Sequence, residues 1–253
     1  MVIEIKALIL AAGYATRLYP LTKNKPKALL ELKGKTMVEH IIKKIDEIPQ
    51  VDEILVVTNN KFSLEFEQWA EDFNSRKPKK PVKIINDATL SENDRLGAVG
   101  DIKFSVDEEK TVGDLIVIAG DNLFEYSLKK MYDYAIQKNS DVIACFEAPS
   151  VEYVANTFGV IELDKNNKLV GFEEKPKEPK TRIAATACYY FKHDTLKLIE
   201  KYIKEGNNTD NTGDFIKYLI SKVPVHGFVF REKWFDIGTF EALGKARDEF
   251  NGN

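Results

Sequence analysis

The sequence predicts an α/β fold, in which a mixed, mostly parallel sheet is flanked by helices. Over the first 150 residues, short apolar runs alternate with amphipathic segments, and this β-α-β order is typical of an open parallel sheet with right-handed crossovers. Beyond residue 150 the expected strands come closer together, which indicates a small β-rich portion. We therefore expect a single domain over residues 1–253, built from a portion of about 1–150 and a portion of about 151–253.

Buried strands of a parallel sheet are apolar on both faces, because helices cover both sides. The runs with this character in the first portion are "KALILAAG" at 6–13, "EILVVTN" at 53–59, "VKIIND" at 82–87, "DLIVIAGDN" at 114–122 and "DVIACFEAP" at 141–149. Segments with apolar residues three to four positions apart predict the helices between them. These segments span 36–48, 62–76, 96–108 and 127–139.

The second portion begins with a predicted hairpin. The run "FGVIELDKNNKLVGFEEKP" at 158–176 is typical of two strands around a turn at Asn166-Asn167. Residues 185–203 predict a strand that leads into a helix, and 212–223 predict a further helix. Residues 224–250 predict strands and a final helix.

Composition excludes several classes of protein. A net charge of −3 gives no global attraction to nucleic acid or to an anionic membrane, so neither is an expected partner. No apolar stretch approaches the roughly 20 residues that span a bilayer. Cys145 and Cys188 lie far apart in the chain, without metal-ligand spacing, and we expect them to be reduced thiols. These features predict a soluble, cytoplasmic protein.

The loop after the first strand combines a glycine with many positive charges. Ligands of open parallel sheets bind beyond the carboxyl ends of the strands, and Gly13 lets the chain turn sharply there. Arg17 supplies a planar fork of donors that suits phosphate oxygens. Further charges and rigidity come from Lys23, Lys25, Lys27, Pro20 and Pro26. This composition predicts a binding site for a polyphosphate.

Three familiar motifs are excluded. The dinucleotide pattern G-x-G-x-x-G fails, because Ala15 and Leu18 stand at its later glycine positions. "GKT" at 34–36 lacks the P-loop glycine, since Leu29 stands there. The histidines are isolated in the sequence and predict no zinc site; they are His40, His193 and His226.

The run "LILAAGYATRLYPLTKNKPKALLEL" at 8–32 resembles the signature of the sugar-phosphate nucleotidyltransferases, L-A-x-G-x-G-T-R-L-x-P-L-T-x-x-x-P-K. It departs from that signature at Ala15, where the family has a second glycine. Further segments resemble family motifs in the same order: "LGAVGDI" at 96–102, "IAGDNLF" at 118–124, "FGVIELD" at 158–164, "FEEKP" at 172–176 and "WFDIGTFEAL" at 234–243. The resemblance covers about residues 3–245 and implies a Rossmann-like fold of the glycosyltransferase-A type. It also implies that the first portion binds nucleotide and the second binds sugar phosphate.

The implied activity is that of an enzyme of the EC 2.7.7 type, which transfers a nucleotidyl group from a nucleoside triphosphate to a sugar 1-phosphate and releases pyrophosphate. The expected pair is glucose 1-phosphate with UTP or dTTP. Two alternatives stay open at this point. One is transfer to a non-sugar phosphate, such as phosphocholine or inositol phosphate, for which the aromatic run "CYYF" at 188–191 offers a cation-binding cage. The other is a catalytically silent regulator that binds a nucleotide-sugar.

The chemistry of this reaction explains the residue types. The attacking phosphate is already ionised near neutral pH, so no general base is needed, whereas cations and in-line placement are. The resemblance implies Mg²⁺ held by Asp121 and Asp236, and Arg17 on the leaving phosphates. It implies Lys27 near the α-phosphate and Lys175 on the sugar phosphate.

The remaining expected contacts follow the same motifs. Nucleotide-binding residues are expected to be Leu10, Ala12, Gly13, Thr16, Arg17, Asn86, Asp87, Gly97 and Asp121. Sugar-phosphate-binding residues are expected to be Asn122, Gly159, Glu174, Lys175 and Thr186. Assembly into a homo-oligomer is left open by the sequence.

Overall fold

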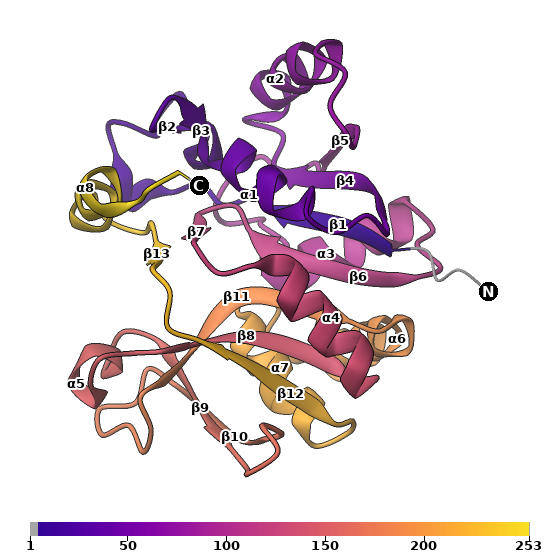
Figure 1. The fold of residues 1–253 in the computed structure, drawn as a ribbon. Helices are drawn as coiled ribbons and strands as arrows, with labels where there is room; N and C mark the ends of the chain where they lie inside the picture. Colours follow the sequence, from indigo (N-terminus) through magenta and orange to yellow (C-terminus); the bar gives the residue numbers. More distant parts are fainter. Residues whose placement is uncertain (1–4, 253) are drawn as a thin grey trace.

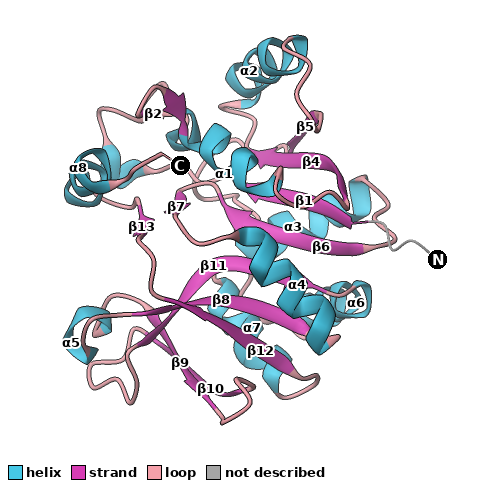
Figure 2. Cartoon of the chain, in the orientation of Figure 1, coloured by secondary structure: helices cyan, strands magenta, loops and turns pink. Residues whose placement is uncertain are grey.

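The computed structural model of the protein describes residues 5–252, and within them nine strands form one sheet (Figures 1 and 2). The main path of this sheet runs β10-β9-β11-β6-β1-β4-β5, and β8 joins β11 to β12. The bounds are β1 Ile5–Leu10, β4 Val51–Thr58, β5 Val82–Asn86, β6 Asp114–Ala119, β8 Asp141–Glu147, β9 Gly159–Leu163, β10 Leu169–Glu174, β11 Ile183–Phe191 and β12 Val225–Phe230. β1 pairs in parallel with β4 and β6, and β4 with β5, so their carboxyl ends meet at one edge.

Helices cover both faces of the sheet and bury two apolar clusters. Successive residues of β1 show why both faces are apolar: Ile9 packs into one cluster and Leu8 into the other. The first cluster lies under α1 Met37–Ile45, α2 Ser63–Ser75 and α4 Leu128–Lys138. The second lies under α3 Gly97–Glu108, α6 His193–Lys204 and α7 Thr212–Ile220. The predicted mixed, mostly parallel sheet flanked by helices is therefore confirmed.

β11 joins the two portions of the chain into one sheet. Its C-terminal half pairs antiparallel with β6, and it also pairs antiparallel with β8 and β9. The hairpin expected at 158–176 is present as β9 and β10, and its turn includes Asn167 with a φ of 61°.

Several short elements have no counterpart in the sequence-based prediction. They are the turns η1 Thr16–Leu18 and η2 Lys27–Leu29, the strands β2 Glu31–Leu32, β3 Lys35–Thr36 and β7 Asn122–Phe124, and the helix α5 Val151–Val154. The short strand β13 Trp234–Asp236 falls within residues 224–250, where the sequence predicts strands. β7 and β13 pair with each other, although more than a hundred residues separate them. A three-residue strand of this kind has too little local signal to be recognised before its partner is known. The last helix, α8 Phe240–Glu249, packs beside them in a third apolar cluster.

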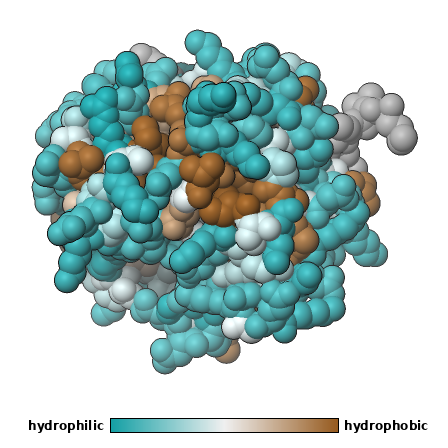
Figure 3. All heavy atoms as spheres, turned by 90° about the horizontal axis from the view of Figure 1, so that it is seen from below, coloured by the Kyte–Doolittle hydropathy of each residue, from teal (hydrophilic) through white to brown (hydrophobic). Residues whose placement is uncertain are grey.

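The surface is largely hydrophilic. Figure 3, seen from below Figure 1, shows one hydrophobic strip across a mostly polar face. Scattered apolar surface is normal for a folded protein, so this strip by itself assigns no partner. Among residues 5–252, no helix combines the length and the apolar character that crossing a bilayer requires.

Candidate active site

A cleft of about 600 Å³ opens at the carboxyl ends of β1 and β6. Its walls come from the loop after β1, the end of β5, the start of α3 and the residues that follow β6, with Lys175 and Thr212 from the second portion. Most of the expected nucleotide-binding residues line this cleft: Leu10, Ala12, Gly13, Thr16, Arg17, Asp87, Gly97 and Asp121. Segments far apart in sequence are thus brought together where open parallel sheets place their ligands.

The loop after β1 is held in a defined shape by its own contacts. Ala15, at the position where the family signature has glycine, has a φ of 49° and a ψ of 40°, which is the left-handed region that glycine adopts more easily. The Thr22 hydroxyl donates to the Ala15 carbonyl at 2.8 Å and fixes this turn. Ala15 lines the cleft, so the strained residue lies at the site itself.

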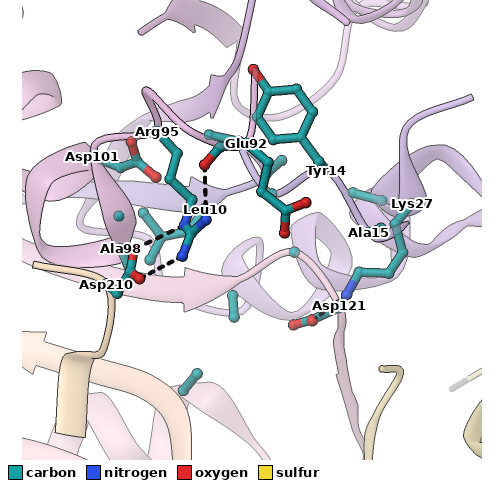
Figure 4. A pocket seen from close by; sticks show the side chains of 18 of the residues that line it. Leu10, Tyr14, Ala15, Lys27, Glu92, Arg95, Ala98, Asp101, Asp121 and Asp210 are labelled. Carbon is teal, nitrogen blue, oxygen red and sulfur yellow. Dashed lines mark hydrogen bonds and ion pairs between the residues drawn. The ribbon is translucent and has the colours of Figure 1, made fainter. Parts of the chain in front are cut away.

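Lys27 and Asp121 form an ion pair at the bottom of the cleft. The Lys27 ammonium donates to Asp121 Oδ2 at 2.5 Å, and Figure 4 shows the two side chains end to end. Burial disfavours the charged form of Asp121, but the Lys27 ammonium outweighs it and holds the pKa of Asp121 below its ordinary value. Asp121 is therefore a carboxylate at neutral pH.

Asp236 is placed beside Asp121 by strand pairing. Asp236 on β13 lies opposite Asn122 on β7, and the Ile237 N–H donates to the Asp121 carbonyl at 3.0 Å. Asp236 is exposed to solvent and is not among the residues that line the cleft, although neighbouring protein atoms crowd its carboxyl group. Burial and then the neighbouring Asp121 carboxylate raise the pKa of Asp236 to about 6.

The two carboxylates fit a divalent cation as a donor set. Their mutual repulsion, expressed in the raised pKa of Asp236, is the kind that a bound cation relieves. Lys27 supplies a positive charge at this point in the structure. Within residues 5–252 there is no cluster of three or more carboxylate, imidazole or thiolate groups. A metal held by Asp121 and Asp236 would thus complete its shell with phosphate oxygens and water, as Mg²⁺ commonly does.

Asn122 holds the Asp121 carboxylate instead of facing the cleft. Its side-chain N–H donates to Asp121 Oδ1 at 3.0 Å, and its oxygen accepts from the Trp234 indole N–H at 2.6 Å. Asn122 is buried, and these bonds occupy its amide. This position does not favour the expected contact of Asn122 with the sugar, because its amide bonds to Asp121 and Trp234.

Arg17 and Lys175 add cationic groups to the same end of the cleft. The Arg17 guanidinium lies beside Gly238, two residues after Asp236, and within the described part of the chain it forms no ion pair. Lys175 has a φ of 46°, and its ammonium lies 3.5 Å from Glu174. Both cations lower the pKa of Asp236 and so oppose the effects of burial and of Asp121.

The opposite end of the cleft is acidic. The Arg95 guanidinium makes a two-pronged contact with Asp210, with distances of 2.9 and 2.6 Å, and also donates to the Glu92 carbonyl at 2.8 Å (Figure 4). Gly97 explains why a glycine begins α3: its φ is 78°, and a Cβ would lie 2.6 Å from the Asp210 backbone. This close approach joins the start of α3 to the loop before α7.

Sequence reasoning missed the residues that build this acidic end. They are Glu92, Arg95, Asp101, Asp210 and Thr212. Arg95 and Asp210 are 115 positions apart, so their contact has no local signal. Asp101 could have been singled out, because it is a charged residue between apolar Val99 and Ile102 on the buried face of a predicted helix.

Three further expected residues lie away from the cleft. Thr186 is 1% exposed and donates to the Ala144 carbonyl at 2.8 Å, so it belongs to the sheet interior and does not contact a ligand. The Asn86 amide donates to Asn60 at 2.9 Å and turns toward β4. Gly159 pairs with Glu174 across the hairpin, and a Cβ on it would lie 2.6 Å from the Phe172 ring. Thr186 is buried in the sheet, which does not favour its expected contact, whereas the nucleotide contact of Asn86 stays a prediction. Packing against Phe172 accounts for the glycine at Gly159.

The chain belongs to the nucleotidyl transferase family, whose sequence profile matches residues 6–251. This confirms the resemblance on which the site residues were selected.

Individual relatives agree with this assignment. The bifunctional protein GlmU of Methanocaldococcus jannaschii is 32% identical over 233 residues, which are 92% of this chain and 51% of GlmU. Glucose-1-phosphate adenylyltransferase of Thermotoga neapolitana is 31% identical over 149 residues, which are 56% of this chain and 34% of that enzyme. The chain thus spans about half the length of the GlmU relatives. The structure of UDP-glucose pyrophosphorylase complexed with UDP-glucose has a TM-score of 0.79, covers 97% of both chains at 20% identity, and confirms the fold.

Proposed function

We propose that the protein transfers a nucleotidyl group from a nucleoside triphosphate to a sugar 1-phosphate. The observation that carries this proposal is the Lys27–Asp121 pair at 2.5 Å on the wall of the cleft, with Arg17 on the same wall and Asp236 placed next to Asp121 by the pairing of β13 with β7. Two carboxylates beside free and paired cations suit a reaction between two anions that repel each other. Membership of the nucleotidyl transferase family supports the same reaction.

The reaction needs no general base, because the attacking phosphate oxygen is already ionised. An oxygen of the sugar phosphate attacks the α-phosphorus, the bond from this phosphorus to the bridging oxygen breaks, and pyrophosphate leaves. A divalent cation, when bound, would supply charge stabilisation at the reacting phosphates. Lys27 orients the Asp121 carboxylate and offers its ammonium to the α-phosphate, and Arg17 binds the departing phosphates.

The acceptor that we propose is glucose 1-phosphate. Lys175 borders the cleft from the second portion and binds the phosphate of the acceptor, and Glu174 beside it accepts hydrogen bonds from sugar hydroxyls. The relatives include a glucose-1-phosphate adenylyltransferase, and a similar fold was solved with UDP-glucose, which supports a glucosyl acceptor. The sequence predicts UTP or dTTP as donor, and the residues at the acidic end of the cleft, considered below, argue against that prediction.

The aromatic run that left phosphocholine open is buried. Tyr189, Tyr190 and Phe191 are at most 3% exposed, and the two hydroxyls bond to Thr212 and Asp114. A cage for a quaternary ammonium needs open aromatic faces, so this run no longer favours a choline acceptor.

Pyrophosphate release tests the proposal. The assay pairs UTP, dTTP, CTP, GTP and ATP with the 1-phosphates of glucose, mannose and N-acetylglucosamine, and with phosphocholine and inositol phosphate, in the presence of Mg²⁺. Release that requires glucose 1-phosphate supports the proposal. Release only with a non-sugar phosphate would replace the acceptor, and triphosphate binding without release from any pair would favour the regulator.

A further inference from the structure

The acidic end of the cleft differs chemically from the end that holds Lys27 and Arg17. Its wall carries Asp87, Glu92, Asp101 and Asp210, with Arg95 as the one cation among these described lining residues. The Arg95 guanidinium donates to Asp210 and to the Glu92 carbonyl. It therefore forms no ion pair with Asp87 or Asp101. Figure 4 shows Arg95, Asp101 and Asp210 on one side of the cleft and the Lys27–Asp121 pair on the other.

The separation of acidic and cationic residues in the cleft determines the direction in which a nucleoside triphosphate lies. Phosphates are repelled by carboxylates and attracted by ammonium and guanidinium groups. The triphosphate therefore belongs beside Lys27 and Arg17, and the uncharged base extends to Asp87 and Asp101.

Asp87 is a fixed hydrogen-bond acceptor at that end. Its Oδ1 accepts from the backbone N–H and from the hydroxyl of Thr89, both at 2.7 Å. These bonds hold the carboxylate in place on the wall of the cleft.

Asp101 is the less usual member of the pair. It is 7% exposed, it lines the cleft, and within the described residues its buried Oδ1 has no hydrogen-bond partner. Burial, the charge of Asp87 and a hydrogen bond to Asp87 raise the pKa of Asp101 to about 8. Asp101 therefore keeps its proton at neutral pH, and its unpartnered oxygen is an acceptor that awaits a donor.

Nucleobases differ in the donors that they offer to such acceptors. Cytosine, adenine and guanine each carry an exocyclic amino group, which donates two N–H bonds. Uracil and thymine present one ring N–H between two carbonyl oxygens, and carboxyl oxygens oppose those carbonyls. A cleft wall with several acceptor oxygens therefore favours bases that carry an amino group. A base without this group leaves the buried acceptors without hydrogen bonds, which weakens its binding.

We propose that Asp87 and Asp101 select a base with an exocyclic amino group, so that the donor is CTP, ATP or GTP and not UTP or dTTP. This inference rests on the proposed function, since it assumes that the cleft holds a nucleoside triphosphate.

Equilibrium binding of all five triphosphates tests the selection independently of turnover, with inorganic tripolyphosphate as a probe that has no base. We expect at least one of CTP, ATP and GTP to bind roughly ten-fold or more tightly than UTP and dTTP, the effect of one or two hydrogen bonds. Asp101→Leu removes both oxygens and should bring this ratio close to one, with tripolyphosphate binding unchanged. Asp101→Asn keeps an acceptor oxygen and should retain most of the affinity ratio. This second variant tests the acceptor separately, so the proposal stays testable even if the leucine variant misfolds. Asp107→Asn, at an exposed site on the same helix, is the matched control.

The outcomes separate the two proposals. Tightest binding of UTP or dTTP, or an unchanged ratio in Asp101→Leu, overturns the base selection whether or not pyrophosphate is released. The expected ratio without pyrophosphate release from any acceptor keeps the base selection and overturns the proposed reaction. Binding of tripolyphosphate without binding of any nucleotide overturns both.

Discussion

The indole N–H of Trp234 donates to the side-chain oxygen of Asn122 at 2.6 Å, and this bond fixes the orientation of the Asn122 amide. The amide in turn donates to Asp121 Oδ1 at 3.0 Å. A tryptophan on β13 therefore orients a carboxylate that precedes β7, and the same strand carries Asp236. Groups that orient a metal-binding carboxylate often matter nearly as much as the carboxylate itself.

Replacing Trp234 by Phe should weaken Mg²⁺-dependent activity. The phenyl ring keeps the contacts with Phe146 and Phe158 but removes the donor to Asn122, so the amide is free to turn away from Asp121. We expect roughly a ten-fold rise in the Mg²⁺ concentration needed for half-maximal pyrophosphate release, and a loss of about 1–3 kcal/mol in the free energy of unfolding. A Mg²⁺ titration and urea denaturation measure the two effects.

Trp69→Phe provides the matched control. The Trp69 indole N–H is buried and has no hydrogen-bond partner among the described residues, so this replacement removes no bond. If both variants shift the Mg²⁺ requirement equally, the Trp234–Asn122 bond has no role in orienting Asp121.

Asp121→Asn should abolish most of the activity and leave the fold intact. The change removes the charge that pairs with Lys27 and one of two carboxylates assigned to the metal. We expect a fall of at least about 100-fold in pyrophosphate release, the scale on which charge stabilisation acts in active sites, with an unchanged circular dichroism spectrum. Near-normal turnover would refute the assignment of Asp121. Asp133→Asn breaks an exposed Lys–Asp pair on α4 and should leave the rate unchanged.

Much of the fold and part of the site could be predicted from the sequence. There is a physical reason why the remaining site residues could not. Lys27 and Asp121 are 94 positions apart, yet each lies in its own local motif beyond a strand, so both were identified and the structure brings them together. Both were selected through the family motifs, and the structure brings these motifs together because parallel strands meet with their carboxyl ends at one edge. The strands could be predicted from apolar runs, because a strand that is covered on both faces is apolar at nearly every position.

The expectations that the geometry does not favour, and the residues that were missed, concern side chains whose positions depend on distant partners. Asn122 sits in a motif but is committed to Trp234, and Thr186 is committed to Ala144 across the sheet. Arg95 meets Asp210 through a loop that approaches Gly97, and no periodicity in the sequence indicates that approach. Side-chain hydrogen bonds across long sequence separations are set by tertiary packing, which a local pattern does not contain.

Ala15→Gly should stabilise the protein. Ala15 has a φ of 49°, where a Cβ crowds the backbone and glycine does not. Relief of this strain exceeds the added flexibility of the unfolded chain, and we expect the free energy of unfolding to rise by about 0.5–1 kcal/mol. Ala155→Gly is the comparison, because Ala155 has a φ of −57° and should lose stability on the same replacement. Equal losses in both variants would contradict strain at Ala15.

Asp101 should make the unliganded protein less stable as the pH rises from about 6 to 8. The pKa of Asp101 is raised to about 8 by burial and by the charges of Asp87 and Asp210, whereas an unfolded aspartate titrates near its ordinary value. Between these values the folded protein holds a proton that the unfolded chain has released, so each rise in pH favours unfolding. Asp141, with a pKa raised to about 6 by burial, has an effect in the same direction. Its titration takes place mainly near or below pH 6, at the lower end of this range.

Asp101→Asn removes the titration while keeping the shape and an acceptor oxygen. Because one group changes the free energy of unfolding by at most about 1.4 kcal/mol per pH unit, the variant should gain about 2 kcal/mol on the wild type between pH 6 and 8. Urea denaturation at several pH values measures this gain, and Asp107→Asn on the same helix should show none. A difference between Asp101→Asn and wild type that stays constant with pH would mean that Asp101 is already ionised at pH 6. Asp101 would then face the base as a carboxylate and not as a neutral carboxyl group.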